Sequence, residues 1–204
     1  VDTLVLSHAN SDHLNGLIYI AENFHVKNVW TNNEPADTFG YCLFMEAIKK
    51  NNIRMPAYYK IAGVHDINGV HIDILSPQKD FIEKRKTETW RNLDNNSLIL
   101  KASFKDVSFL FPGDIKSRAE YELVSTVGDK LRSSVLLAPH HGSKTSSTKR
   151  FLEKVKPEVV VNQYLMLATK YEYGVNNRAY RFYLYTDGKL HWLISPDGGY
   201  DYDS

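Results

Sequence analysis

The stretch LVLSHANSDHLNG, residues 4–16, decides the fold. Its apolar start predicts a buried strand, and the apolar positions that follow the loop recur at helical spacing. The loop between them carries His8, Asp12 and His13, whose nitrogen and oxygen atoms suit zinc, manganese or iron. The stretch alone leaves two interpretations open. Either the three side chains form a metal site, or Asp12 caps the following helix and the histidines are surface residues.

Two further apolar runs end in the same kind of side chain. SVLLAPHHGS, residues 134–143, places His140 and His141 just past a predicted strand, and SFLFPGD, residues 108–114, ends in Asp114. Three strands that each end in metal-binding groups favour a metal site at one rim of a sheet.

Short apolar runs alternate with amphipathic stretches, which predicts a mixed α/β domain. The expected strands are residues 3–6, 26–31, 70–75, 97–104, 107–111, 134–138, 158–161 and 189–194. The expected helices are residues 14–24, 38–51, 116–127 and 145–155. Hairpin turns are predicted at residues 68–69 and 105–106, and the polar segment 78–96 is interpreted as a surface excursion with a short helix. We expect one domain over residues 1–204.

Composition excludes several classes of protein. The 204 residues carry 25 Lys and Arg against 24 Asp and Glu, so the net charge of +1 gives no global case for a nucleic-acid-binding module. Cys42 is the single cysteine, which excludes an internal disulfide framework. No apolar run approaches the ~20 residues of a membrane span.

Taken together, the motifs resemble those of a known family. HANSDH, residues 8–13, resembles the HxHxDH signature of the metallo-β-lactamase superfamily, and FPGD, residues 111–114, resembles its later Gly-Asp motif. PHHGSKTS, residues 139–146, is similar to a segment of the C-terminal hydrolase domain of ComEC/Rec2 competence proteins and their free-standing relatives. DNNSLIL, residues 94–100, resembles the strand entry of that subgroup, and the likeness extends from residue 1 to about residue 161.

The resemblance implies a four-layer αββα sandwich with two divalent ions, zinc or manganese, at the rim of the sheets. His8 would help to hold the first ion, and Asp114 would bridge the two. The second ion would be held by Asp12, His13 and one of His140 or His141. His140 is the preferred ligand because it lies nearer the strand end, which leaves His141 to contact the substrate or protonate the leaving group.

Three departures from the family pattern qualify this expectation. Asn10 stands where most members have histidine, so it is at best a weak ligand, which favours manganese or a single ion. No histidine lies between His71 and Asp114, which leaves Asn95 or Asn96 at the place of the usual third motif. The family's opening hairpin is also missing, so we expect an N-terminally incomplete domain.

Two polar segments bear on the substrate. Ser143, Lys144 and Thr145 follow the paired histidines, and hydroxyls, backbone donors and a cation at a helix start suit a phosphate group. The alternative is a helix cap beside solvated lysines. Farther on, aromatic and basic residues that alternate could stack the bases of a single strand, or could cover a sheet or helix face. They are Tyr164, Lys170, Tyr171, Tyr173, Arg178, Tyr180, Arg181, Tyr183 and Tyr185.

The leading hypothesis is a hydrolase that uses a metal-activated water, with Asp12, Asp114 and His141 as catalytic residues. As the competence-type resemblance implies, it would be a phosphodiesterase or nuclease that acts on DNA. The first alternative is a free-standing hydrolase of a small phosphoester or another ester. The second is a degenerate domain that binds a partner without catalysis, which Asn10 favours. A free-standing enzyme would be cytoplasmic, whereas a part of a competence channel for DNA uptake would be attached to a membrane protein. Oligomeric state is left open.

Overall fold

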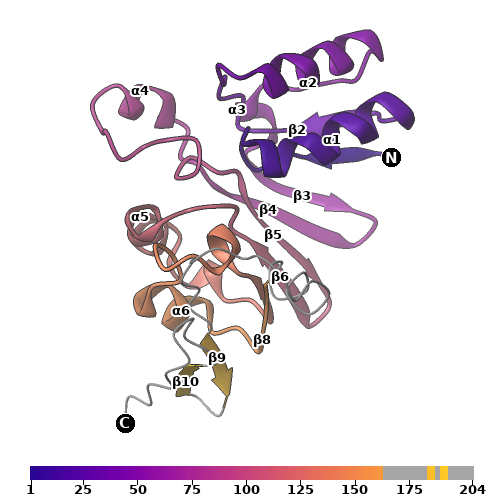
Figure 1. Ribbon diagram of the computed structural model, residues 1–204. Coiled ribbons are helices and arrows are strands. Elements are labelled where there is room, and N and C mark those ends of the chain that lie inside the picture. Colours follow the sequence, from indigo (N-terminus) through magenta and orange to yellow (C-terminus); the bar gives the residue numbers. More distant parts are fainter. Residues whose placement is uncertain (163–182, 187–188, 193–204) are drawn as a thin grey trace, which may run out of the picture.

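Two sheets of unequal size form the framework of the protein (Figure 1). The structure is a computed structural model that describes residues 1–162, 183–186 and 189–192. The strands are β1 (Thr3–Val5), β2 (Asn28–Trp30), β3 (Gly63–Ile67), β4 (Val70–Ser76), β5 (Ile99–Phe104), β6 (Val107–Phe111), β7 (Val135–Leu137), β8 (Val159–Val161), β9 (Tyr183–Thr186) and β10 (Lys189–Trp192). The helices are α1 (Ser11–Asn23), α2 (Phe39–Lys50), α3 (Tyr58–Ile61), α4 (Phe81–Arg85), α5 (Ser117–Val127) and α6 (Lys149–Val155).

The larger sheet has the strand order β3-β4-β5-β6-β7-β8. Strands β3 to β6 are antiparallel, and β7 and β8 continue the sheet in parallel. The predicted hairpins join β3 to β4 and β5 to β6. Asn68 and Gly69 both have positive φ, 53° and 82°, which is the geometry that makes Asn-Gly a favoured two-residue turn. In the smaller sheet β1 pairs with β2 in parallel, and β9 and β10 form a separate antiparallel pair.

Three hydrophobic clusters show how helices and sheets are layered. One joins α1 and α2 to the smaller sheet. A second lies between the sheets, where Trp30 of β2 packs with Ile74 of β4. The third joins α5 and α6 to the larger sheet and contains Leu110 and Phe151. The order helix, sheet, sheet, helix confirms the predicted four-layer mixed α/β architecture, with α1 and α2 on one outer side and α5 and α6 on the other (Figure 1).

The ends of β1, β6 and β7 meet at one rim. The backbone N–H of Leu98, just before β5, donates to the Ser7 carbonyl oxygen at 2.7 Å and ties the two sheets together there. Because β5 runs antiparallel to β6, the residues before β5 lie at the rim where β6 ends. Four chain segments therefore reach the same place.

Two helix starts differ from the prediction. Helix α1 begins at Ser11, with Asn10 at its N-cap position, so Asp12 lies inside the first turn and does not cap the helix. Helix α6 begins at Lys149, not at residue 145, and is capped by Thr148, whose Oγ1 accepts a hydrogen bond from the Phe151 N–H. The intervening residues form a loop. The predicted surface excursion contains the short helix α4, whereas α3 was not among the expected elements and β3 was expected only as the first arm of the predicted hairpin.

Candidate metal centre

Four side chains from the three strand ends come together at the rim. Asp12 and His13 come from the start of α1, Asp114 from the loop after β6, and His141 from the loop after β7. Within the described part of the chain they form the one group of His, Cys, Asp or Glu side chains that could hold a metal ion, with one donor atom of each within 4.8 Å of the others. The sequence places these residues up to 129 positions apart, so convergence of the strand ends is what assembles them.

The distances in this group suit a small cation. The Nε2 atom of His13 lies 3.1 Å from Asp114 Oδ1 and 3.2 Å from His141 Nε2. The Nε2 atom of His141 lies 3.1 Å from Asp12 Oδ2 and 3.3 Å from Asp114 Oδ2. Tetrahedral ligands about 2.1 Å from a zinc ion are about 3.4 Å from one another. The donor set and its spacing therefore fit a divalent metal ion.

His8 adds a fifth donor on the buried side of Asp114. Its side chain is fully buried, and its Nε2 atom has no hydrogen-bond partner among the residues that the structure describes; this atom lies 3.8 Å from both Asp114 Oδ2 and Asp94 Oδ1. Its other ring nitrogen contacts the hydroxyls of Ser7 and Ser97, at 3.1 and 3.3 Å. A buried polar atom without a partner is costly unless a ligand satisfies it. A cation between His8 and the two carboxylates would do so.

Burial and neighbouring charges set the ionisation of this group. Burial, followed by the nearby His13, lowers the pKa of His8 to about 4, although the carboxylates of Asp114 and Asp94 act to raise it. The ring is therefore neutral at pH 7 and can donate a lone pair. For Asp114, burial acts to raise the pKa, but hydrogen bonds from His13 and His141 outweigh burial and hold the pKa well below its usual range. Both groups are in the state that a metal ligand requires.

Ser97 and Gly113 hold the buried side in place. The Ser97 hydroxyl donates to the Asp94 carbonyl oxygen at 2.7 Å and accepts from the Asp114 backbone N–H at 3.2 Å. Gly113 has φ 62°, and a Cβ at this position would lie 2.6 Å from the Ser97 side chain. Only glycine permits both the left-handed backbone and the close approach of the two loops. The Gly-Asp motif thus positions Asp114 through Ser97.

Asp94 is the site residue that the sequence reasoning missed. Its Oδ1 accepts a hydrogen bond from Asn10 Nδ2 at 2.7 Å, and its Oδ2 lies 2.6 Å from Lys116 Nζ. Asn10 therefore faces Asp94. Asn95 and Asn96, which were expected at the place of the family's third motif, form their hydrogen bonds outside the site. Asn95 Nδ2 donates to the Trp90 carbonyl oxygen, and Asn96 Nδ2 donates to Glu34. The signal was present in the sequence as the carboxylate directly before the two asparagines.

The paired histidines have different neighbours. Both have positive φ, 50° at His140 and 55° at His141, an uncommon conformation for residues with a side chain. His141 belongs to the four-residue group, whereas His140 Nδ1 lies 3.0 Å from the Thr145 hydroxyl. The structure thus brings His141, and not the preferred His140, into the group of candidate ligands.

The loop after the paired histidines is fixed by a buried carboxylate. Glu120 of α5 is fully buried and accepts the backbone N–H groups of Ser147 and Thr148, at 2.5 and 2.7 Å. Ser147 has φ 61°, a left-handed conformation that a helix does not contain, so α6 starts after it and later than predicted. Ser143 Oγ and Thr145 Oγ1 are 3.1 Å apart on the exposed side of the loop, and Lys144 between them is exposed. The predicted phosphate-binding residues therefore face solvent beside His140.

The tyrosine-rich segment, residues 164–185, lies outside the described residues, apart from the backbone of β9. In the described residues, no helix combines the length and the apolar character that crossing a membrane requires.

No family model matches the chain. Among curated proteins it is 24% identical over 165 residues to "ComE operon protein 3" of Bacillus subtilis, a match that covers 79% of this chain and 20% of that protein. It is 39% identical over 84 residues to "Competence protein ComA" of Neisseria gonorrhoeae, covering 40% of this chain and 12% of that protein. These matches confirm the predicted resemblance to competence proteins, and the chain spans a fifth or less of their length.

Among solved structures, "CmlA beta-hydroxylase E377D mutant" aligns with a TM-score of 0.48 at 11% identity, covering 78% of this chain and 36% of that one. A likeness at this level assigns neither fold nor function.

Proposed function

We propose that this protein is a metal-dependent phosphodiesterase that cleaves DNA at the rim where β1, β6 and β7 end. The observation that carries the proposal is the pair of donor sets on either side of Asp114. Its Oδ1 faces His13, and its Oδ2 faces both His141 and the unpartnered nitrogen of His8. Such an arrangement suits two divalent ions, zinc or manganese, with Asp114 shared between them.

His13, His141 and Asp12 would hold the outer ion, and His8 and Asp94 would face the inner one. The bound ions would lower the pKa of a water molecule and neutralise charge on the phosphate. Asp94 replaces Asn10 as the candidate ligand of the inner position, because the Asn10 amide donates to it. Asn10 is then a positioning residue and no longer a reason to expect a defective site.

The other residues would orient the substrate and move the proton. Asp12, whose side chain is 49% exposed, can pass a proton from the attacking water to solvent. Ser143, Lys144 and Thr145 offer hydroxyls and a cation to the phosphate beside the centre. His140 is held by Thr145 at the edge of this loop and can donate a hydrogen bond to a phosphate oxygen.

DNA as substrate is supported by the competence proteins among the relatives, since competence is the ability to take up DNA. As the resemblance to competence proteins implies, attachment to a membrane protein is part of the proposal. A small phosphoester or another ester is the competing substrate class, and a binding domain without catalysis is the competing function.

A substrate panel tests the proposal. Chelator-treated protein is assayed with added manganese or zinc on labelled single-stranded and double-stranded oligonucleotides, bis(4-nitrophenyl) phosphate, 4-nitrophenyl phosphate and 4-nitrophenyl acetate. We expect metal-dependent turnover of the oligonucleotides and of the diester, which Asp114→Ala abolishes. Asp106→Ala, an exposed aspartate in the turn before β6, is the control and should act like the parent.

Turnover of the monoester or the acetate alone would show that the substrate is a small ester and not DNA. If no substrate shows metal-dependent turnover, the competing function, a binding domain without catalysis, would be favoured.

A further inference from the structure

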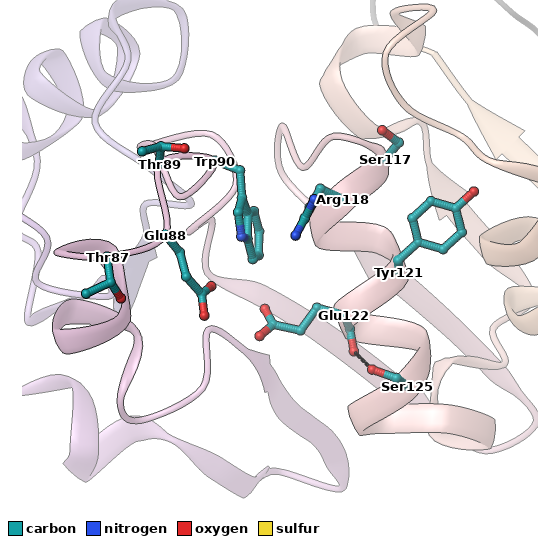
Figure 2. A pocket seen from close by; sticks show the side chains of 9 residues that line it. All are labelled: Thr87, Glu88, Thr89, Trp90, Ser117, Arg118, Tyr121, Glu122 and Ser125. Carbon is teal, nitrogen blue, oxygen red and sulfur yellow. Dashed lines mark hydrogen bonds between the residues drawn. The ribbon is translucent and has the colours of Figure 1, made fainter.

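A groove of about 900 Å³ lies between the loop before β5 and the flank of α5 (Figure 2). Its lining consists of Thr87, Glu88, Thr89 and Trp90 on the loop, and of Ser117, Arg118, Tyr121, Glu122 and Ser125 on α5. None of these residues takes part in the proposed catalysis, so the groove is open to a separate role.

Both walls of the groove are attached to the rim. Asn95 joins them, since its Nδ2 donates to the Trp90 carbonyl oxygen at 2.6 Å and its Oδ1 accepts the Lys116 N–H at 2.8 Å. Ser117, the first residue of α5 in the groove, donates its N–H to the carbonyl oxygen of Thr145 in the candidate phosphate loop, at 2.9 Å. The groove and the candidate metal centre are therefore connected through the start of α5.

An aromatic ring on the loop wall faces a cation on the α5 wall. Figure 2 shows Trp90 and Arg118 facing across the hollow, with Tyr121 farther along α5. The Arg118 guanidinium lies 5.7 Å from the centre of the Trp90 ring, and none of the ion pairs found among the described residues includes it. Arg118 is exposed and long, so it can move aside or close over a flat group placed on the indole.

Arg91 offsets one of the two negative charges of the groove's carboxylates, and Arg118 offsets the other. Glu88 and Glu122 both bind the buried guanidinium of Arg91, which in turn lies 4.3 Å from the centre of the Trp90 ring. Their charges are engaged in holding Arg91 and the indole. Arg118 and, farther along, Arg150 over the Tyr121 ring provide positive charge for a passing backbone.

We propose that the groove binds the single-stranded nucleotide chain next to the scissile phosphate, with one base stacked on Trp90 and the adjoining phosphate held by Arg118. The inference rests on the proposed phosphodiesterase function and adds a binding site to it. Aromatic faces alternating with arginine are the features that bind single strands without regard to sequence.

Kinetics with two substrates of different length test the groove. The variants Trp90→Leu and Arg118→Gln are compared with the parent on a twelve-residue thymidine oligonucleotide and on bis(4-nitrophenyl) phosphate, which has neither a nucleobase nor a second phosphate. We expect KM for the oligonucleotide to rise about 10-fold in each variant, within the range that loss of one base stack produces, with kcat/KM for the small diester unchanged within twofold. Tyr59→Leu and Lys60→Gln alter a second aromatic-cation pair, 5.9 Å apart on α3, and should leave both substrates unaffected.

An oligonucleotide with abasic sites separates stacking from charge. The parent should bind the thymidine strand about 10-fold more tightly than an abasic strand of equal charge, and Trp90→Leu should not distinguish them. Fluorescence anisotropy with metal-free protein measures this without turnover, so the groove can be tested even if the proposed catalysis fails. Equal binding of both strands by the parent, equal losses on both kinetic substrates, or binding of polyglutamate in preference to the oligonucleotide would overturn the inference.

Discussion

The candidate metal centre and the groove along α5 differ in how their side chains are held. In the centre, His8 and Asp114 are buried and each contacts a serine or backbone group that fixes its orientation. In the groove, Arg118 is exposed and pairs with no carboxylate among the described residues. Reacting groups must keep a fixed geometry, whereas a site that receives a flexible strand can adapt. The two regions should therefore respond differently to substitution.

The largest effect should come from the two adjacent histidines. His141→Ala removes a member of the four-residue group, so we expect kcat to fall at least about 1000-fold on oligonucleotide and small diester alike, together with weaker metal binding. His140→Ala lies next to it but outside the group and should cost about 10-fold at most. Steady-state kinetics and calorimetric metal titration of both variants provide the measurement. If His140→Ala lowered kcat and metal binding more than His141→Ala, His140 and not His141 would be the metal ligand.

The next effect concerns the backbone that supports Asp114. Gly113→Ala combines a left-handed φ of 62° with a Cβ placed 2.6 Å from Ser97, so we expect a loss of about 2–4 kcal/mol of unfolding free energy and reduced metal affinity. Urea denaturation measures the stability. Gly16→Ala is the matched control, because nothing lies within 4 Å of its added Cβ and alanine favours a helix, so it should be neutral or stabilising. Equal behaviour of the two variants would contradict the role given to Gly113.

A smaller effect should come from the carboxylate under the phosphate loop. Glu120→Ala leaves the N–H groups of Ser147 and Thr148 without their acceptor, which should cost about 2 kcal/mol. Because this loop follows the paired histidines, KM should rise for both substrates, unlike the oligonucleotide-specific effect expected in the groove. Thermal unfolding measures the loss of stability, and steady-state kinetics measures the rise in KM. Glu153→Ala, an exposed glutamate on α6, should change neither.

The smallest effect should come from Asn10. Asn10→Ala removes one hydrogen bond to Asp94, while Lys116 still holds the other carboxylate oxygen. We expect metal affinity to fall about 5-fold, equivalent to roughly 1 kcal/mol. Competition with a fluorescent chelator measures the affinity. If Asn10→Ala binds metal no more weakly than the parent, Asn10 does not position Asp94.

The mixed α/β layout and the position of the candidate site at the strand ends could be predicted from local patterns in the sequence, whereas the four-layer arrangement was expected only from the family resemblance. His8, Asp12 and His13 follow one apolar strand, and Asp114 follows another, so local patterns sufficed to place them at a rim. The choice between His140 and His141 depends on two consecutive left-handed residues, a backbone feature that apolar periodicity does not report.

Contacts distant in the sequence account for what could not be predicted. The loop before α6 is held by Glu120, 28 positions from Thr148. The groove depends on Trp90 and Arg118, which meet only when the loop before β5 packs beside α5. Asp94 is positioned at the candidate site by a hydrogen bond from Asn10, which is 84 positions away in the sequence. These pairings have no local signature in the sequence, although Asp94 itself was visible as the carboxylate directly before Asn95 and Asn96.

The central claim is that the rim of β1, β6 and β7 is a metal centre, and anomalous X-ray scattering from crystals grown with manganese or zinc tests it most directly. We predict an anomalous peak about 2.0–2.2 Å from Nε2 of His13, Nε2 of His141 and a carboxylate oxygen of Asp114, with a second peak beside His8 Nε2. Crystals at saturating metal that show no peak among these atoms, or peaks only elsewhere on the protein, would contradict the claim.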